Sequence, residues 1–126
     1  MAIEKLSLDE AFATIDGYWQ PKIAADVNDA QVKLAKFKGA FDWHHHEAED
    51  ELFLVIAGQM RMGLRDSEGE RFTDLDAGEM IMVPHGVEHR PEALSEECHV
   101  LMVEPNSTLN TGNVTNDRTV TDLERL

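Results

Sequence analysis

Short runs of apolar residues, separated by turn-forming residues, make up most of the chain beyond Gly17. Residues 52–56 are apolar without interruption, which is typical of a strand buried on both faces between two layers. In residues 60–64 apolar side chains alternate with others, which predicts a strand with one face on the core. The two patterns together indicate neighbouring strands, the first central and the second half-exposed.

Other segments have the same β-like character, and we expect strands at residues 22–26, 31–38, 80–83 and 99–103. Residues 66–70 and 76–78 are rich in Asp and Gly and predict turns, while Pro84 and Pro105 end the strands before them. Short strands with a turn every ~8 to 12 residues are typical of an all-β sandwich or barrel. A parallel α/β fold would need helical segments that the pattern lacks.

The two ends of the chain differ from this β pattern. Ser7 followed three residues later by Glu10 has the form of a capping box, which predicts a short helix of about two turns. Residues 106–121 are rich in Asn, Thr and Ser without periodicity, and we expect an irregular arm that lies on the barrel or on a partner subunit. Residues 122–126 are expected to form a helical turn or a frayed end.

Length and charge limit the possible functions. With 126 residues, of which 42% are hydrophobic, we expect a single domain over residues 1–126 with a barrel core at about 22–105. A net charge of -14 argues against nucleic acid or an anionic membrane as a partner. The single cysteine, the absence of a secretory signal pattern at the amino terminus and the absence of a long apolar run predict a cytoplasmic protein.

Histidines provide the candidate chemistry. His44 and His46 are two residues apart, so on a strand both would point to the same face, while His45 would face away. Glu51 has the wrong parity for the same straight strand, so residues 47–50 must form a turn or bulge that directs it inward. His89 follows in the loop of residues 84–89. Three imidazoles and one carboxylate form a ligand mixture that Fe, Mn, Ni, Co, Cu or Zn accepts, whereas Ca and Mg prefer oxygen.

These residues form two motifs that resemble those of the cupin superfamily. The first, His-x-His, three or four residues, Glu, six residues, Gly, is matched at His44, His46, Glu51 and Gly58. The second, Gly, five residues, Pro-x-Gly, two residues, His, is matched by the set Gly78, Pro84, Gly86 and His89. The resemblance implies a double-stranded β-helix barrel of jelly-roll type, commonly a homodimer, in which the three histidines and the glutamate bind a divalent transition metal.

The chain departs from the cupin pattern at two positions. Gly39 precedes His44 by five residues where the pattern usually has six, and Ala93 stands where an asparagine is often found four residues after the last histidine. Neither departure affects a residue of the implied ligand set.

Six further residues have chemistry that the motifs do not use. We expect His45 to face solvent or an interface, His85 to be an exposed turn residue, and Cys98 to be a small buried hydrophobe. His99 fits a hydrogen-bonded core or interface position as well as a pocket position. Arg61 and Arg90 could each receive a substrate carboxylate by a bidentate pair, although exposed arginine is more common. One of the acidic residues at 47–50 is a candidate acceptor for a ligand imidazole.

Two classes of function fit the cupin resemblance. The first is a metal-dependent enzyme that acts on a small polar metabolite, an oxygenase if the ion is iron, or an isomerase or lyase. The second is a non-catalytic module that holds a small-molecule ligand, such as a sugar or an organic acid, with a bound or structural metal. The fold class does not choose between them.

Overall fold

The computed structural model describes residues 3–126, so Met1 and Ala2 lie outside the described residues. Within this range the chain forms one helix and eight strands: α1 Leu8–Thr14, β1 Lys22–Val27, β2 Ala30–Phe37, β3 Glu51–Ala57, β4 Gln59–Asp66, β5 Gly69–Asp76, β6 Met80–Val83, β7 Glu88–Ala93 and β8 Cys98–Pro105. In this part of the chain no helix is long and apolar enough to cross a membrane. The predicted all-β jelly-roll barrel with a short N-terminal helix is confirmed.

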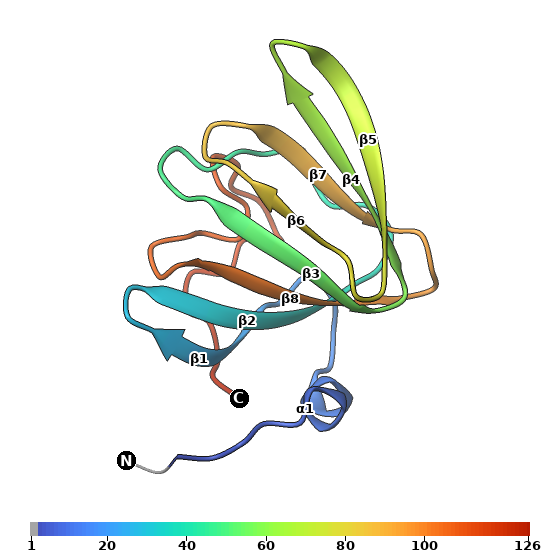
Figure 1. Ribbon diagram of the computed structural model, residues 1–126. Helices are drawn as coiled ribbons and strands as arrows, with labels where there is room; N and C mark the ends of the chain where they lie inside the picture. Colours follow the sequence, from blue (N-terminus) through green and yellow to red (C-terminus); the bar gives the residue numbers. More distant parts are fainter. Residues whose placement is uncertain (1–2) are drawn as a thin grey trace.

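The strands form two antiparallel sheets (Figure 1). One has the order β1-β2-β8-β3-β6 and the other the order β5-β4-β7. Because β8 lies between β2 and β3, the end of the strand region is inserted between two early strands, as expected for a jelly roll. The chain passes from one sheet to the other at Gly58, where φ is +87° and a Cβ would lie 2.5 Å from Ser95 Oγ. This close approach explains the glycine at the end of the first motif.

The core lies between the two sheets. Phe53 and Val55 of β3 and Met60 and Met62 of β4 are buried in it, and the alternation predicted for β4 is confirmed. The prediction that β3 is buried on both faces is wrong in part, because its other side chains lie half-buried on the outer face of the five-stranded sheet. Met80 and Met82 of β6 are likewise outward and exposed, whereas Val83 points inward.

Two strands were not apparent from the sequence. β5 is exposed along almost its whole length, so it has no apolar pattern, and in Figure 1 it forms a hairpin with β4 that extends beyond the barrel. β7 contains His89, which therefore lies on a strand and not in a loop. Pro91 is tolerated there because β7 is an edge strand of its sheet.

Helix α1 covers part of the outer face of the five-stranded sheet. Ser7 is its N-cap, and the Ser7 hydroxyl accepts a hydrogen bond from Glu10 N, as the capping box predicts. Phe12 and Ile15 pack on Leu34 of β2 in a second apolar cluster. The helix therefore covers part of the outer face of the sheet, whereas the four site residues predicted from the motifs are not part of this cluster.

The C-terminal arm lies on the barrel. Asn113 N donates to His45 O, and Asn113 Oδ1 accepts from His45 N, at 3.0 and 2.8 Å. At Gly112 φ is +56° and a Cβ would lie 2.2 Å from His45 O, so only glycine allows this close packing. The last residues form neither a helical turn nor a frayed end, because Arg125 pairs with Ile23 of β1 in a parallel bridge.

Candidate metal centre

Backbone pairing brings the four predicted site residues together. His44 and His89 are opposite each other in an antiparallel bridge, with N–H···O distances of 3.0 and 2.8 Å, so their rings leave the backbone on the same side. His46 lies two residues further on the same segment, and its carbonyl accepts a hydrogen bond from Gly86 N. The chain bends at residues 47–48 and enters β3 at Glu51, which confirms the predicted change of direction.

The four side chains converge in a buried cluster. One candidate ligand atom from each of His44, His46, Glu51 and His89 lies within 4.8 Å of all the others. Glu51 Oε1 is 3.3 Å from His46 Nε2 and 3.2 Å from His89 Nε2. Each of the four residues is at most 4% exposed. Bulk water is therefore excluded from the group.

Backbone carbonyls orient two of the imidazoles. His44 Nδ1 lies 2.9 Å from Asp42 O, and His89 Nδ1 lies 2.9 Å from Val87 O. Because a carbonyl only accepts, each Nδ1 carries the proton and each Nε2 keeps its lone pair free. The predicted acidic acceptor from residues 47–50 is thus wrong for these two rings, since the acceptors are main-chain groups.

The electrostatics favour neutral histidine beside an ionised carboxylate. Burial, followed by the neighbouring His89, lowers the pKa of His44 from 6.5 to about 4. Burial raises the pKa of Glu51, but the neighbouring Glu104, His46 and His89 outweigh it and hold that pKa well below its usual range. Near neutral pH the cluster therefore offers an imidazole lone pair and an anionic oxygen.

The arrangement fits a divalent transition metal. Two ligand atoms ~2.1 Å from one ion can be at most ~4.2 Å apart, close to the separations in this cluster. His46 Nε2 is buried without a hydrogen-bond partner, an arrangement that is costly unless something else satisfies the nitrogen. His44, His46, Glu51 and His89 would hold the ion, and the His₃Glu donor set is one that borderline metals accept.

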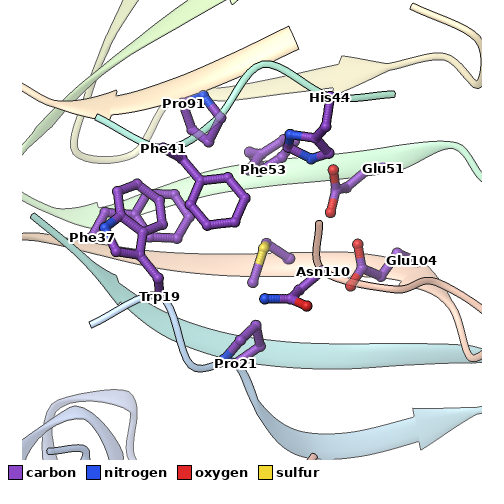
Figure 2. Close-up of a pocket in the computed structure, with 11 residues that line it drawn as sticks. Trp19, Pro21, Phe37, Phe41, His44, Glu51, Phe53, Pro91, Glu104 and Asn110 are labelled. Atoms are coloured by element: carbon purple, nitrogen blue, oxygen red, sulfur yellow. The ribbon is translucent and has the colours of Figure 1, made fainter. Parts of the chain in front are cut away.

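A small cavity adjoins the cluster. It has a volume of about 30 Å³, and His44 and Glu51 form part of its wall. The remaining wall includes four aromatic side chains, those of Trp19, Phe37, Phe41 and Phe53, as Figure 2 shows. A volume of this size holds about two water molecules. The cavity is thus a small apolar space with polar groups at one end.

Two further residues of the site were missed by the sequence analysis. Glu104 of β8 lines the cavity beside Glu51, and Lys33 Nζ of β2 lies 2.7 Å from Glu104 Oε1. Both residues are buried, with exposed fractions of 1% for Lys33 and 3% for Glu104. Burial and the negative charge of Glu51 raise the pKa of Glu104 well above its usual range. The parity of their strands was a usable signal, because both occupy inward positions that alternate with core residues.

The other candidate histidines and the cysteine lie outside the cluster. His45 faces outward and pairs with Glu47, and exposed His85 pairs with Asp50. His99 stacks on Phe12 of α1, with ring centroids 4.6 Å apart, on the outer face of the sheet. Cys98 is fully buried in the core, as expected.

The two candidate arginines are held at the surface. Arg61 forms a bidentate pair with Asp74, at 2.8 and 3.1 Å. Arg90 lies over the Trp43 ring, 5.6 Å from its centroid, and near Glu92. Neither arginine lines the cavity, so the structure gives neither of them a role in binding a substrate there.

Comparison with known proteins agrees with the fold and the motifs. The cupin domain family matches residues 31–104, and the chain belongs to this family. A cupin-2 domain containing protein of Shewanella frigidimarina is 39% identical with a TM-score of 0.74, over 80% of this chain and 94% of the other. The uncharacterised protein YdbB of Bacillus subtilis is 41% identical over 52% of this chain and 56% of YdbB, so the chain matches little more than half of that relative.

A metal-containing cupin is also among the similar structures. Oxalate decarboxylase of Bacillus subtilis, which contains Mn(II) centres, is 26% identical with a TM-score of 0.56. The similarity covers 72% of this chain and only 23% of the decarboxylase. The cupin fold and a buried His₃Glu cluster that fits a metal are therefore features of this protein.

Proposed function

We propose that the protein is a metal-dependent enzyme that acts on a small polar metabolite, with His44, His46, Glu51 and His89 as the ligands of a divalent transition metal. The observation that carries the proposal is the buried convergence of four ligand atoms within 4.8 Å, with one imidazole nitrogen left without a partner. A metal in this position would polarise a carbonyl or hydroxyl group of a bound molecule. Mn is one candidate, because a similar cupin structure contains Mn(II), and Fe, Ni, Co, Cu and Zn accept the same donor set.

The residues of the chain prepare the site before any ligand arrives. Asp42 O and Val87 O fix the rings of His44 and His89, so these ligands need little reorganisation. The aromatic side chains of Trp19, Phe41 and Phe53 line the adjoining cavity and would provide an apolar contact for a substrate.

Elemental analysis of the untagged protein tests the metal site. We expect about one transition-metal ion per chain in the wild type, and a loss of at least tenfold in affinity for His44→Ala and His89→Ala. His85→Ala is the matched control, because it removes an exposed histidine that lies outside the cluster. Wild-type protein that binds no stoichiometric metal after reconstitution would refute the proposed function.

A second assay addresses the class of reaction. Oxygen uptake by the metal-loaded protein, measured with a panel of small acids, phenols and thiols, identifies oxygenase chemistry. Product analysis under anaerobic conditions with hydroxy acids and sugars identifies isomerase or lyase chemistry. Turnover in either arm that His89→Ala abolishes supports the proposal.

The size of the cavity favours one rival function. A space of about 30 Å³ is smaller than a typical ligand pocket, and the four ligand residues are almost inaccessible. These features suit a non-catalytic module in which the metal closes the barrel or holds a very small ligand. Stoichiometric metal, raised thermal stability and inertness across both substrate panels would favour this rival.

We further propose that the protein is a homodimer, as the cupin resemblance implies. Leu52 and Leu54 of β3 are paired with Met82 and Met80 of β6, so these four side chains share the outer face of the five-stranded sheet. The two methionines are 50% and 64% exposed, which makes an apolar surface on a highly acidic chain. Light scattering should give twice the chain mass, and Met80→Glu with Met82→Glu should give a monomer.

The cytoplasm is the proposed location, on the basis of one unpaired and buried cysteine. Fractionation of cells that express the native chain tests it, and recovery outside the cytoplasmic fraction would contradict it.

A further inference from the structure

A buried ion pair lies directly behind the ligand carboxylate. The register pairs Gln31 of β2 with Glu104 of β8, and Lys33 reaches Glu104 diagonally across the same strands. Both side chains are removed from water, which is costly for a lysine and a carboxyl group even when they are paired. An apolar pair of similar volume would fill the core with less desolvation, so packing alone does not account for this pair.

The same register places Glu104 opposite Glu51. β3 pairs with β8 through Leu52 and Val103, and one residue further along this antiparallel ladder Glu51 faces Glu104. Figure 2 shows the two carboxyl groups pointing toward each other. Glu104 Oε2 is buried and receives no donor from a protein side chain or backbone group, while Glu104 Oε1 accepts from Lys33. The free end of the Glu104 carboxyl is therefore directed at Glu51.

The two ends of the Glu51 carboxyl have different neighbours. Its Oε1 lies 3.2 to 3.3 Å from the Nε2 atoms of His89 and His46, and its carboxyl faces the Glu104 carboxyl, as Figure 2 shows. Two facing carboxyl groups can share one proton as a hydrogen bond. A carboxylate held in this way offers one oxygen to an ion and cannot rotate freely about its last torsion. Ligands of metal sites are commonly fixed by such outer hydrogen bonds.

We propose that Glu104, fixed by Lys33, is a positioning residue that holds the Glu51 carboxylate with Oε1 toward the three imidazoles. This inference rests on the proposed metal site and deepens it, because it adds two residues that act through Glu51 without touching the ion. Removing an outer-shell partner of a metal ligand typically lowers metal affinity ~10- to 100-fold.

Cobalt(II) binding to the purified full-length chain tests the proposal. Affinity is measured by competition with a chromophoric chelator, and the visible absorption bands of bound Co²⁺ report the ligand geometry. We expect Glu104→Ala to bind Co²⁺ ~10- to 100-fold more weakly than the wild type, with altered bands. Glu104→Gln should retain both the affinity and the bands, because its amide can donate to Glu51 and accept from Lys33. Asp74→Ala, which breaks an exposed ion pair, is the control.

A double variant guards against loss of folding in Glu104→Ala. Lys33→Met combined with Glu104→Leu replaces the buried pair by apolar groups, a change that commonly leaves a fold intact. Its melting temperature with EDTA should be close to that of the wild type, whereas its Co²⁺ affinity should fall as in Glu104→Ala.

Four outcomes decide the matter. Weaker binding in both Glu104→Ala and the double variant, with rescue by Glu104→Gln, supports the positioning role. Wild-type affinity and spectrum in Glu104→Ala or in the double variant overturn it. Loss of binding in Glu104→Gln as well also overturns it, because Glu104 would then act through its own charge. Wild-type protein that binds no Co²⁺ removes the proposed metal site itself, which is a separate failure.

Discussion

His44 should make the metal-free protein strongly dependent on pH for its stability. The pKa of this residue is lowered to about 4 in the folded chain, whereas an unfolded histidine titrates near its ordinary 6.5. Between these pH values His44 is protonated in the unfolded chain but not in the folded chain. Its contribution to the free energy of unfolding is therefore fully present above about pH 6.5 and is lost as the pH falls toward 4. At ~1.36 kcal/mol for each tenfold change in proton affinity, the loss amounts to about 3 kcal/mol. That is a large share of the ~5 to 15 kcal/mol of a typical domain.

Urea unfolding at several pH values between 4 and 7, with EDTA present, measures the effect. His44→Gln keeps a polar side chain but cannot titrate, so its free energy of unfolding should fall by about 3 kcal/mol less than that of the wild type. The surface carboxyl groups also titrate in this range, but they are common to both proteins and cancel in the difference. Equal pH dependence of the wild type and His44→Gln would show that burial does not hold His44 neutral. His85→Gln is the control for an exposed histidine.

Three other measurements probe the same structure. Cys98 is fully buried, and burial raises the pKa of its thiol to about 11, so an aromatic disulfide reagent at pH 8 should label it only after denaturation; rapid labelling of folded protein would contradict the core position. Gly112→Ala should lower the unfolding free energy by about 2 kcal/mol or more in urea titrations, because a Cβ would lie 2.2 Å from His45 O at a positive φ, and an unchanged midpoint would refute the close packing of the arm. Saturation with Mn²⁺ or Co²⁺ at ~100 times the dissociation constant should add about 2.7 kcal/mol and raise the melting temperature by about 10 °C, and a melting curve unaffected by either ion would contradict metal binding in the folded state.

The fold was predictable because most of its strands have one face in the core. Alternation identified β4, and turn residues delimited β3 and β6. β5 was missed because it is exposed along almost its whole length, so its sequence has no alternation of apolar and polar residues. β7 was missed because it contains Pro91, a residue that usually argues against a strand, and His89, which we expected in a loop. Its pairing with residues 40–44 depends on contacts between segments far apart in the sequence.

Residue spacing identified the four clustered residues, but it could not identify Glu104, which faces Glu51, or Lys33, which pairs with Glu104. His44, His46 and Glu51 are close in sequence, and one further motif supplies His89. Glu104 belongs to no such motif, because it lies next to Glu51 only through the register of β3 and β8.

Lys33 could still have been suspected from its strand alone. An inward lysine between Gln31 and Ala35 violates the expected pattern of a buried face, and a violation of this kind needs a partner of opposite charge. Glu104 is the matching violation on β8, where it follows Met102 on the inward face. Two opposite charges at inward positions of strands that pair with each other predict a buried ion pair. In a barrel whose interior also contains a histidine cluster, such a pair is therefore a reason to look for a carboxylate ligand between the pair and the histidines.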